Sequence, residues 1–337
     1  MKYRIAIIGA GLIGRKRADS LRKFRNCKLV VTVDIDKDRA LKLVADYGGE
    51  AEVDWKKVVY RNDIDIVIVS TISNMSAPIT LLALRQGKHV LCEKPLGINS
   101  KESKKIVDTA IKYNRLVKAG FNHRFHPAII KAKSLCEKGF IGKPHFIRAC
   151  YGHGGRAGME KEWRLNKTLA GGGELRDQGV HLIDLCRWFA GEFHEVVATC
   201  STKFWKVDVE DNAFLIMNNH DTTASIHVST THWGNTFSFE IFGEQGMINI
   251  QGLGRRYGIE TITFGQRQPP FNDLKTKTIS YPDTDDSWQK EWDNFLKAIQ
   301  KKTDLLGSAE DGLRANQIVD AAYASSIKKK VIKTLRR

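Results

Sequence analysis

Residues 4–14 read Arg4-Ile5-Ala6-Ile7-Ile8-Gly9-Ala10-Gly11-Leu12-Ile13-Gly14, an apolar run that passes directly into the pattern G-x-G-x-x-G. Gly9 permits a tight turn, Gly11 lets the backbone approach a pyrophosphate, and Gly14 lets the following helix pack closely on the strand. A bound anion would lie on the unpaired amides at the positive end of that helix. The stretch therefore predicts the N-terminal start of a dinucleotide-binding domain. A glycine-rich turn that binds no ligand is the alternative interpretation of the same sequence. The contacts expected here are Gly9, Gly11, Leu12, Ile13 and Gly14.

An acidic residue, Asp34, ends the next apolar run, about 20 residues beyond Gly14. A carboxylate at this point accepts both hydroxyls of the adenosine ribose and repels a 2′-phosphate. The two residues that follow it are not basic, which favours NAD over NADP as the cofactor. Lys37 and Arg39 are near enough in the sequence to leave some tolerance of NADP open.

Apolar runs alternate with helical stretches from the N-terminus to residue 121. Runs that are apolar on both faces predict a parallel sheet covered by helices on both sides. Strands are expected at residues 4–8, 28–34, 64–70, 89–92 and 116–121. Helices are expected at residues 12–24, 36–47, 76–86 and 100–113, the last of them capped by Ser100.

The pattern changes after residue 121. Between residues 196 and 280 most segments alternate with period two, which predicts a largely antiparallel sheet with one face open or packed on a partner. A strand is expected at residues 146–151 and helices at residues 127–138, 180–189, 288–300 and 310–328. A chain of 337 residues exceeds a typical single core. We therefore predict an α/β protein with two domains. One is a Rossmann-type doubly wound parallel sheet at residues 1–121; the other is an α+β domain with a large, mostly antiparallel open sheet at residues 122–337.

The net charge is +16 and the pI is about 9.5. This charge fits a solvated basic surface, a polyanionic partner, or a field that gathers anionic small molecules. Part of the excess lies at Lys328–Lys330, Lys333, Arg336 and Arg337, behind a helix and without interleaved aromatic residues. A nucleic-acid partner is therefore not expected.

Other function classes are excluded by what the sequence lacks. It contains no apolar run long enough to cross a bilayer, and its N-terminus lacks the features of a secretory signal. We expect a cytoplasmic protein with no membrane partner. The six cysteines are widely spaced and form no C-x-x-C pair, so they are interpreted as small buried side chains and no metal site is predicted.

Three residues are candidates for catalysis. Lys94 follows the apolar run at residues 89–92 and precedes a proline, which would place it at the carboxyl end of a strand, where ligands of open α/β sheets bind. Asp177 and His181 follow three glycines and are four positions apart, so on a helical turn they share one face. An imidazole beside a carboxylate suits the base that alcohol oxidation needs. A solvent-exposed lysine and a surface pair are the plainer interpretations.

Four stretches together resemble the Gfo/Idh/MocA oxidoreductase family, and the likeness extends over nearly the whole chain. One difference lies at residues 71–76, where members commonly carry Thr-Pro-Asn and then a His, but this chain has neither the Pro nor the His. The stretches are Gly9–Gly14, Gly87-Lys88-His89-Val90-Leu91-Cys92-Glu93-Lys94-Pro95-Leu96, Gly120-Phe121-Asn122-His123-Arg124-Phe125, and Asp177-Gln178-Gly179-Val180-His181 with Leu182-Ile183-Asp184.

The resemblance implies a Rossmann domain followed by a domain whose open sheet forms homodimers or homotetramers. It implies that Lys94 contacts the reacting oxygen and the nicotinamide ribose, that His181 is the acid/base, and that Asp177 supports or shares that role. A cis peptide at Lys94–Pro95 is also implied. Further cofactor contacts are expected from Ser70, Thr71, Asn74, Glu93, Lys94 and Asn122.

The substrate is expected to be a sugar or cyclitol with a ring hydroxyl or ketone. Arg156 and Arg164 could hold an anionic group bidentately, and Trp163 could stack on a sugar ring or on a base. With Lys94, Asp177 and His181, the rim candidates are His123, Arg124, Arg156, Trp163 and Arg164. The basic charge and paired arginines favour an anionic or nucleotide-linked sugar, oxidised in making surface glycans. The alternatives are a cyclitol or free-sugar dehydrogenase, an NAD-dependent glycosidase without net redox change, and a non-catalytic NAD-responsive binding protein.

Overall fold

The computed structural model describes residues 2–268 and 274–334 of the chain, so Arg336 and Arg337 lie outside the described residues. The chain forms two compact units. The first comprises residues 1–122, 168–171 and 288–316, and the second comprises residues 123–167, 172–287 and 317–337. The division at residue 121 stays a prediction, but residues 288–316, which the sequence assigned to the second domain, pack with the first unit.

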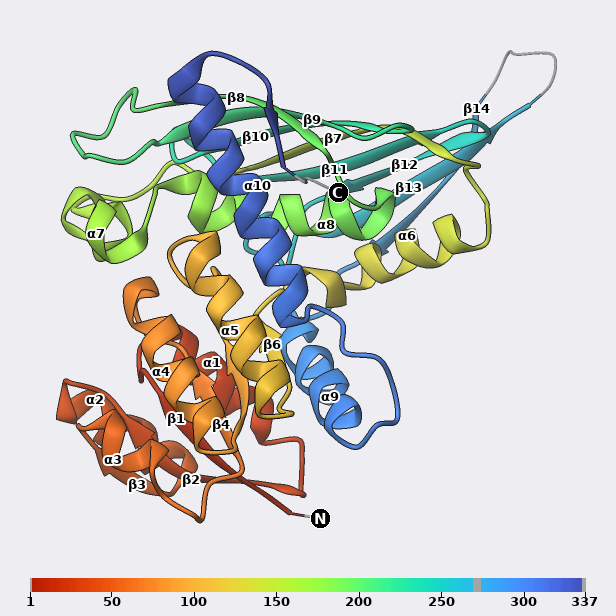
Figure 1. Cartoon of the computed structure of the whole chain (residues 1–337). Coiled ribbons are helices and arrows are strands. Elements are labelled where there is room, and N and C mark those ends of the chain that lie inside the picture. Colours follow the sequence, from red (N-terminus) through yellow and green to blue (C-terminus); the bar gives the residue numbers. More distant parts are fainter. Residues whose placement is uncertain (1, 269–273, 335–337) are drawn as a thin grey trace. The chain divides into compact units, whose positions relative to one another are not determined.

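The first unit contains a parallel sheet of six strands in the order β3-β2-β1-β4-β5-β6 (Figure 1). This order confirms the predicted doubly wound sheet, in which the chain winds first to one side of β1 and then to the other. The strands are β1 (Tyr3–Ile8), β2 (Cys27–Val33), β3 (Glu50–Glu52), β4 (Ile66–Val69), β5 (His89–Cys92) and β6 (Val117–Ala119). The helices are α1 (Leu12–Leu21), α2 (Lys37–Tyr47), α3 (Trp55–Val59), α4 (Ser73–Arg85), α5 (Ser100–Lys112) and α9 (Ser287–Ile299).

Polar side chains cap the N-termini of α2, α3 and α5 in this unit. The Asp36 carboxylate accepts the N–H groups of two residues in the first turn of α2, and Asp54 does the same for one N–H of α3. Asn99 caps α5, so the prediction of Ser100 as the cap is wrong by one residue. An acceptor side chain at this position satisfies amides that have no partner inside the helix.

The second unit contains a nine-stranded sheet in the order β14-β13-β12-β11-β7-β10-β9-β8-β15. The sheet is antiparallel except where β10 runs parallel to β7. Its strands are β7 (Pro144–Gly152), β8 (Glu195–Ser201), β9 (Asn212–Asn218), β10 (Thr223–Ser229), β11 (Thr236–Gly243), β12 (Gly246–Gln251), β13 (Glu260–Arg267), β14 (Leu274–Tyr281) and β15 (Ile332–Lys333). Its helical segments are η1 (Asn122–Phe125), α6 (Pro127–Glu137), η2 (Met159–Lys161), η3 (Trp163–Leu165), α7 (Lys167–Ala170), η4 (Leu175–Gly179), α8 (Val180–Ala190) and α10 (Ala309–Lys328), of which η1, α7 and α10 are shared with the first unit.

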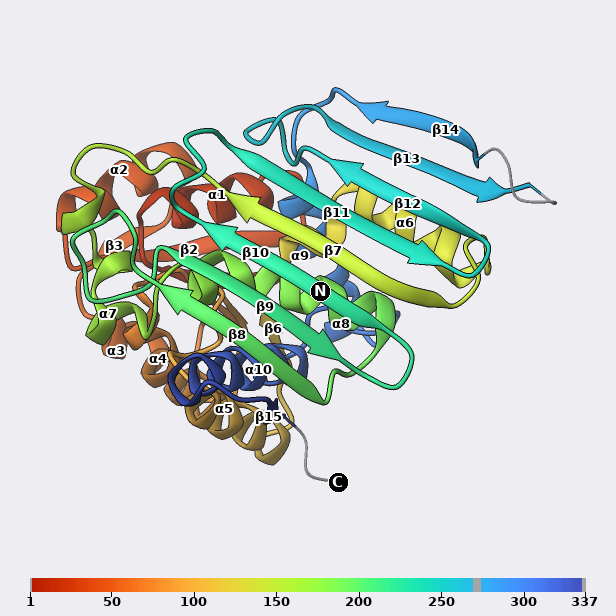
Figure 2. The ribbon, with the colours of Figure 1, turned by 90° about the horizontal axis from the view of Figure 1, so that it is seen from above.

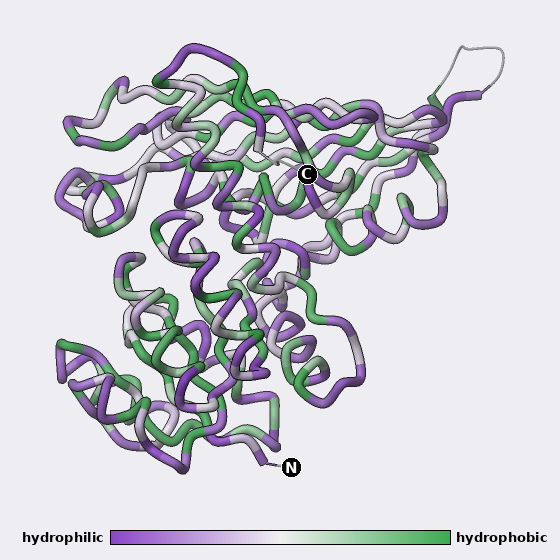
Figure 3. Tube along the Cα trace, in the orientation of Figure 1, coloured by the Kyte–Doolittle hydropathy of each residue, from purple (hydrophilic) through white to green (hydrophobic). Residues whose placement is uncertain are grey.

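The two faces of this sheet differ. Figure 2 shows α6 and α8 behind the strands, on one face. Side chains of β9 alternate between buried and exposed, and hydrophilic and hydrophobic residues are interleaved along the strands (Figure 3). Phe214 and Ile216, which point away from the helices, are 53% and 47% exposed. The period-two pattern is thus explained by a sheet with one face packed on helices. Among the described residues, no helix has the length and apolar character that crossing a membrane requires.

A buried imidazole in the first unit makes a pH-dependent contribution to stability. Burial lowers the pKa of His89 to about 4, and its Nδ1 accepts the Leu116 N–H at 3.1 Å, which only the neutral ring can do. The unfolded chain binds this proton near pH 6.5 and the folded chain only near pH 4, so stability is full above pH 6.5 and falls as the pH drops to 4. We expect a loss of about 1–2 kcal/mol from this group, given its partial exposure. Urea unfolding across this pH range should show a flatter profile for His89→Asn, whose carbonyl keeps the acceptor.

Candidate active site

Most of the predicted cofactor residues lie at one edge of the parallel sheet. β4 pairs in parallel with both β1 and β5, so the carboxyl ends of these strands share that edge. The glycine turn follows β1, Ser70 and Thr71 follow β4, and Glu93 and Lys94 follow β5. The strand order reverses between β1 and β4, which is where doubly wound sheets bind nucleotides.

The glycine turn has the geometry that the sequence predicts. Gly9 has a φ of +103°, and a Cβ added to it would lie 2.4 Å from the Ser70 carbonyl oxygen. A Cβ on Gly14 would lie 1.9 Å from the Gly9 carbonyl oxygen, so only glycine allows α1 to pack this closely against the turn. The Ser70 hydroxyl donates to the Gly9 carbonyl at 2.8 Å. Ser70 therefore supports the turn from the neighbouring strand.

The space beside Gly11 is open. A Cβ on Gly11 would meet no described atom within 4 Å, and Gly11 precedes the first turn of α1, whose amides point to that space. Leu12 and Ile35 are large apolar side chains beside this turn, and they are 67% and 93% exposed. Ile35 directly follows Asp34 and was not among the predicted contacts.

Asp34 is fixed beside the same turn. One carboxylate oxygen accepts the Ala10 N–H at 2.8 Å, and the other accepts the Asp36 N–H at 3.0 Å. Each oxygen keeps a second lone pair for a hydroxyl donor such as that of a ribose. Arg39, the first arginine after Asp34 in the sequence, is paired with Asp36 at 3.1 Å. These contacts suit NAD better than NADP.

Lys94 follows a glutamate that is anchored in the core of the first unit. The Glu93 carboxylate pairs with the fully buried guanidinium of Arg17, which also pairs with the fully buried Glu291. The Arg17 Nε donates to Glu93 at 2.6 Å. Burial raises the pKa of Glu93, and the arginine opposes that shift. The ion cluster fixes the start of the segment that carries Lys94, and the Lys94–Pro95 peptide is cis, as the resemblance implies.

The remaining cofactor candidates occupy defined positions in the same unit. Thr71 donates through Oγ1 to the Ile72 carbonyl at 3.3 Å. Asn74 is half-buried in the first turn of α4, and Asn122 is 5% exposed at the start of η1. Their contacts with a cofactor stay predictions.

Asp177 and His181 belong to the second unit. Asp177 lies in η4, a single π-helical turn, and His181 is the second residue of α8, which continues from it. π turns inside α-helices are frequent at functional sites because the extra residue redirects the side chains around it. The Asp177 side chain keeps 21% of its surface exposed, whereas His181 is 3% exposed.

His181 is held among aromatic rings. Its imidazole stacks on that of His123, with centroids 3.7 Å apart. The His123 ring in turn lies beside the ring of Tyr151, with centroids 5.4 Å apart. The rings of Tyr151 and Tyr257 pack edge to face, with their centroids 4.8 Å apart. Burial raises the pKa of both tyrosines, so they remain neutral hydrogen-bonding groups near neutral pH.

His123 and Arg124 differ from the rim positions expected for them, because both are buried. The Arg124 guanidinium makes a bidentate pair with Asp184, with N–O distances of 2.7 and 2.6 Å. Its plane also lies against the Trp188 ring at 5.3 Å. This buried bidentate ion pair holds α8 to η1, which gives Arg124 a structural role in this unit.

The structure brings Arg156, Trp163 and Arg164 together around a carboxylate that the sequence analysis assigned no role. Glu162 pairs with Arg156 at 2.6 Å and with Arg164 at 3.7 Å. Arg164 also lies 3.5 Å from the Asp177 carboxylate and 4.8 Å from the Trp163 ring centroid. Both arginines thus have carboxylate partners, and Arg164 links the predicted substrate segment to Asp177.

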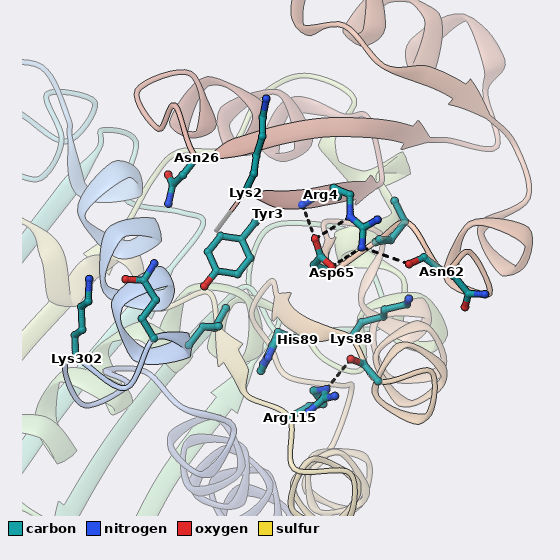
Figure 4. A pocket seen from close by; sticks show the side chains of 14 residues that line it. Lys2, Tyr3, Arg4, Asn26, Asn62, Asp65, Lys88, His89, Arg115 and Lys302 are labelled. Atoms are coloured by element: carbon teal, nitrogen blue, oxygen red, sulfur yellow. Dashed lines mark hydrogen bonds and ion pairs between the residues drawn. The ribbon is translucent and has the colours of Figure 1, made fainter.

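A hollow of about 1050 Å³ lies in the first unit at the opposite edge of the parallel sheet (Figure 4). It is lined by the residues that start β1, β4 and β5, including Arg4, Asp65 and His89. Arg4 donates to Asp65 and Arg115 donates to the Gly87 carbonyl, so these cations already have partners. Because doubly wound sheets bind ligands at the carboxyl ends of their strands, this hollow is not the candidate cofactor site.

Comparison with known proteins identifies both parts of the chain. Residues 3–121 match the model of an oxidoreductase family with an NAD-binding Rossmann fold, and residues 129–249 match the GFO/IDH/MocA C-terminal domain. The chain is 25% identical to myo-inositol 2-dehydrogenase of Thermotoga maritima over 98% of both proteins. It is 29% identical to levoglucosan dehydrogenase of Pseudarthrobacter phenanthrenivorans over 82% of this chain and 81% of that protein. It is 26% identical to D-glucoside 3-dehydrogenase of Escherichia coli over 96% and 95%.

Solved structures support the fold. The structure of a levoglucosan dehydrogenase in complex with NADH superimposes with a TM-score of 0.90 at 24% sequence identity, covering all of both chains. The predicted arrangement of a parallel Rossmann-type sheet and a large, mostly antiparallel sheet is confirmed.

Proposed function

The chain belongs to the Gfo/Idh/MocA family of NAD-dependent oxidoreductases, and from that premise we propose that it oxidises a ring hydroxyl of an uncharged sugar or cyclitol. The relatives named above are dehydrogenases of inositol, levoglucosan and glucosides. They favour the alternative that the sequence left open over the anionic or nucleotide-linked sugar that the net charge suggested.

The observation that carries this proposal is the charge balance around Asp177. The two arginines that suggested an anionic substrate are paired with Glu162 and Asp177. A phosphate arriving there would have to compete with these carboxylates for the same donors. An uncharged polyol needs no free cation: its hydroxyls can donate to the carboxylates, and the half-buried Trp163 offers a ring face for the sugar.

The proposed chemistry assigns one role to each of three side chains. A bound nicotinamide would supply the hydride acceptor. His181 takes the hydroxyl proton as the carbonyl forms, and Asp177 stabilises the imidazolium that results. The Lys94 ammonium donates to the same hydroxyl oxygen and stabilises the negative charge that develops on it. Asp34 would hold the adenosine ribose of the cofactor, and the glycine turn would hold its pyrophosphate.

A substrate panel tests the proposal. The purified chain would be given NAD with levoglucosan, myo-inositol and an alkyl glucoside, and in parallel with sugar phosphates and nucleotide sugars, while the absorbance of reduced cofactor is followed. We expect kcat/KM for the best uncharged substrate to exceed that of any anionic one by at least about tenfold. Turnover of the anionic set alone would refute the proposal. Release of a leaving group from the glucoside without net reduction of NAD would instead favour the glycosidase.

Asp34 is expected to set the choice of cofactor. Asp34→Ala removes the acceptor for the ribose hydroxyls, which should weaken NAD binding by about 10–100-fold, the range for lost hydrogen bonds to a charged group. The preference for NAD over NADP should fall at the same time, since the repulsion of a 2′-phosphate is lost. Fluorescence titration with both reduced cofactors measures this. Asp38→Ala, which removes an exposed acid from the first turn of α2, should leave both affinities within about twofold.

The homo-oligomer that the resemblance implies is also part of the proposal. Exposed apolar side chains gather on the face of the nine-stranded sheet that points away from α6 and α8: Phe146, Val197, Phe214 and Ile216 are 40–53% exposed. An apolar sheet face of this kind is typical of subunit interfaces. Light scattering after size-exclusion chromatography should give a mass of two or four chains; a single chain would contradict this proposal alone.

A further inference from the structure

Three potential metal ligands from separate parts of the sequence meet on the second unit. Cys150 lies on β7 and His227 on β10, and the two are direct partners in the parallel register. His232 follows β10 in the adjoining turn. One ligand atom from each residue lies within 4.8 Å of those of the other two, and all three residues are half-buried.

The orientation of His227 is set by a neighbouring amide. The Asn212 amide nitrogen donates to Asp211 Oδ1 and to Thr231 Oγ1, each at 3.0 Å, so its oxygen faces His227 Nε2 at 3.3 Å. Since an amide oxygen only accepts, Nε2 carries the ring proton and Nδ1 presents a lone pair. The ring also stacks on Phe214, with centroids 3.9 Å apart and planes within 8°.

His232 faces that lone pair. Its Nδ1 lies against the backbone of Gly152, where an added Cβ would be 2.6 Å away, so this glycine makes room for the ring. Its Nε2 lies 3.4 Å from His227 Nδ1 and, because that nitrogen has the lone pair, donates a hydrogen bond to it in the absence of metal. Two imidazole nitrogens bound to one tetrahedral zinc ion are about 3.3 Å apart, given zinc–nitrogen bonds of about 2.0–2.1 Å. The two rings are therefore already spaced as ligands of one ion.

We propose that Cys150, His227 and His232 form a binding site for one zinc ion, with water in the fourth position. One thiolate and two imidazoles form a donor set that suits zinc in tetrahedral geometry. On binding, the Cys150 thiol releases its proton to solvent, and the ring proton of His232 moves from Nε2 to Nδ1, so that the sulfur and both imidazole nitrogens can bond to zinc. The amide of Asn212 is a positioning group that holds His227 in the ligating tautomer.

The ion would tie together two strands and a turn that border the substrate segment. The His153 N–H donates to the Ser229 carbonyl at 3.0 Å, and the His232 N–H donates to the His153 carbonyl at 3.3 Å. The chain runs from this point through Gly155 to Arg156 and Trp163. Zinc would therefore stiffen the backbone that leads into the substrate segment.

Metal titration of the whole chain tests the site. After dialysis against a chelator, calorimetry with zinc chloride should show one ion per chain. Cobalt(II) chloride should give a thiolate-to-cobalt charge-transfer band together with the intense visible bands of a tetrahedral ion. Cys150→Ser should abolish the charge-transfer band and weaken zinc binding by at least about tenfold, whereas Cys136→Ser and His145→Gln, which change a free cysteine on α6 and an exposed histidine on β7, should not. Asn212→Ala should weaken binding by about 10–100-fold while the band stays.

A measurement on the unaltered chain guards against variants that do not fold. Zinc should slow the alkylation of Cys150 by iodoacetamide by about tenfold, followed by peptide mass spectrometry, because a metal-bound thiolate is shielded and its charge is partly neutralised. The rate at Cys136 should not change. Equal rates at Cys150 with and without zinc, or a cobalt spectrum without thiolate character, would overturn the proposal. None of these readouts depends on dehydrogenase activity, so they stand or fall separately from the proposed function.

Discussion

Replacement of His181 by glutamine is expected to lower kcat by about 10²–10⁴-fold, the usual contribution of a positioned general base. Glutamine keeps a planar polar group that can lie against the His123 ring, which now stacks on His181 at 3.7 Å, so the surrounding packing should survive. The affinity for NADH should stay about the same, because the glycine turn and Asp34 are unchanged in the other unit. Steady-state rates with the best substrate and a fluorescence titration with NADH measure the two effects.

The pH profile separates a chemical role of His181 from a structural one. If His181 takes the proton, the acidic limb of the wild-type kcat/KM profile should disappear in the variant, whereas a merely structural role would lower the whole profile evenly. His145→Gln removes an exposed imidazole from β7 and should leave the profile intact. A variant with kcat within about threefold of wild type would remove His181 from the mechanism.

The parallel sheet could be predicted because its strands are apolar on both faces and its first turn needs three glycines. Local patterns of this kind depend on neighbours in the sequence, so β1, β4 and β5 were found within a few residues. β3 was missed because Glu50–Glu52 has two acidic residues and no apolar run; it is a strand only by pairing with β2. The parallel pairing of β10 with β7 was also missed, since period-two alternation says nothing of strand direction.

The candidate site was predicted less completely, because contacts between distant residues leave no local pattern. The spacing of Asp177 and His181 was informative, but not the π turn that carries Asp177. The net charge suggested free arginines at the site, whereas the structure pairs Arg156 and Arg164 with carboxylates. A motif identifies residue types; the partners that neutralise them are set by the fold.

The buried ion cluster around Arg17 shows how much such partners contribute to the free energy of unfolding. Arg17→Met is expected to destabilise the chain by about 3–5 kcal/mol, the cost of leaving buried charge without its counterion. Arg17 and Glu291 are completely buried, and the Glu93 side chain keeps 13% of its surface exposed. The Arg17 guanidinium also lies 4.4 Å from the Trp288 ring centroid, a contact that methionine can partly replace. Urea unfolding followed by circular dichroism measures the loss.

A second substitution shows whether charge or packing is responsible. If uncompensated carboxylates cause the loss, Arg17→Met combined with Glu291→Met should be more stable than Arg17→Met alone, although it removes a further native contact. The loss in the single variant should also shrink as the pH falls from 7 to 5. Burial already raises the pKa of Glu93, and without the arginine the folded state binds protons more readily than the unfolded chain, so acid favours folding. A double variant less stable than the single one would show instead that the guanidinium stabilises the fold through its packing. The charges of the ion cluster would then not be what fixes the segment leading to Lys94.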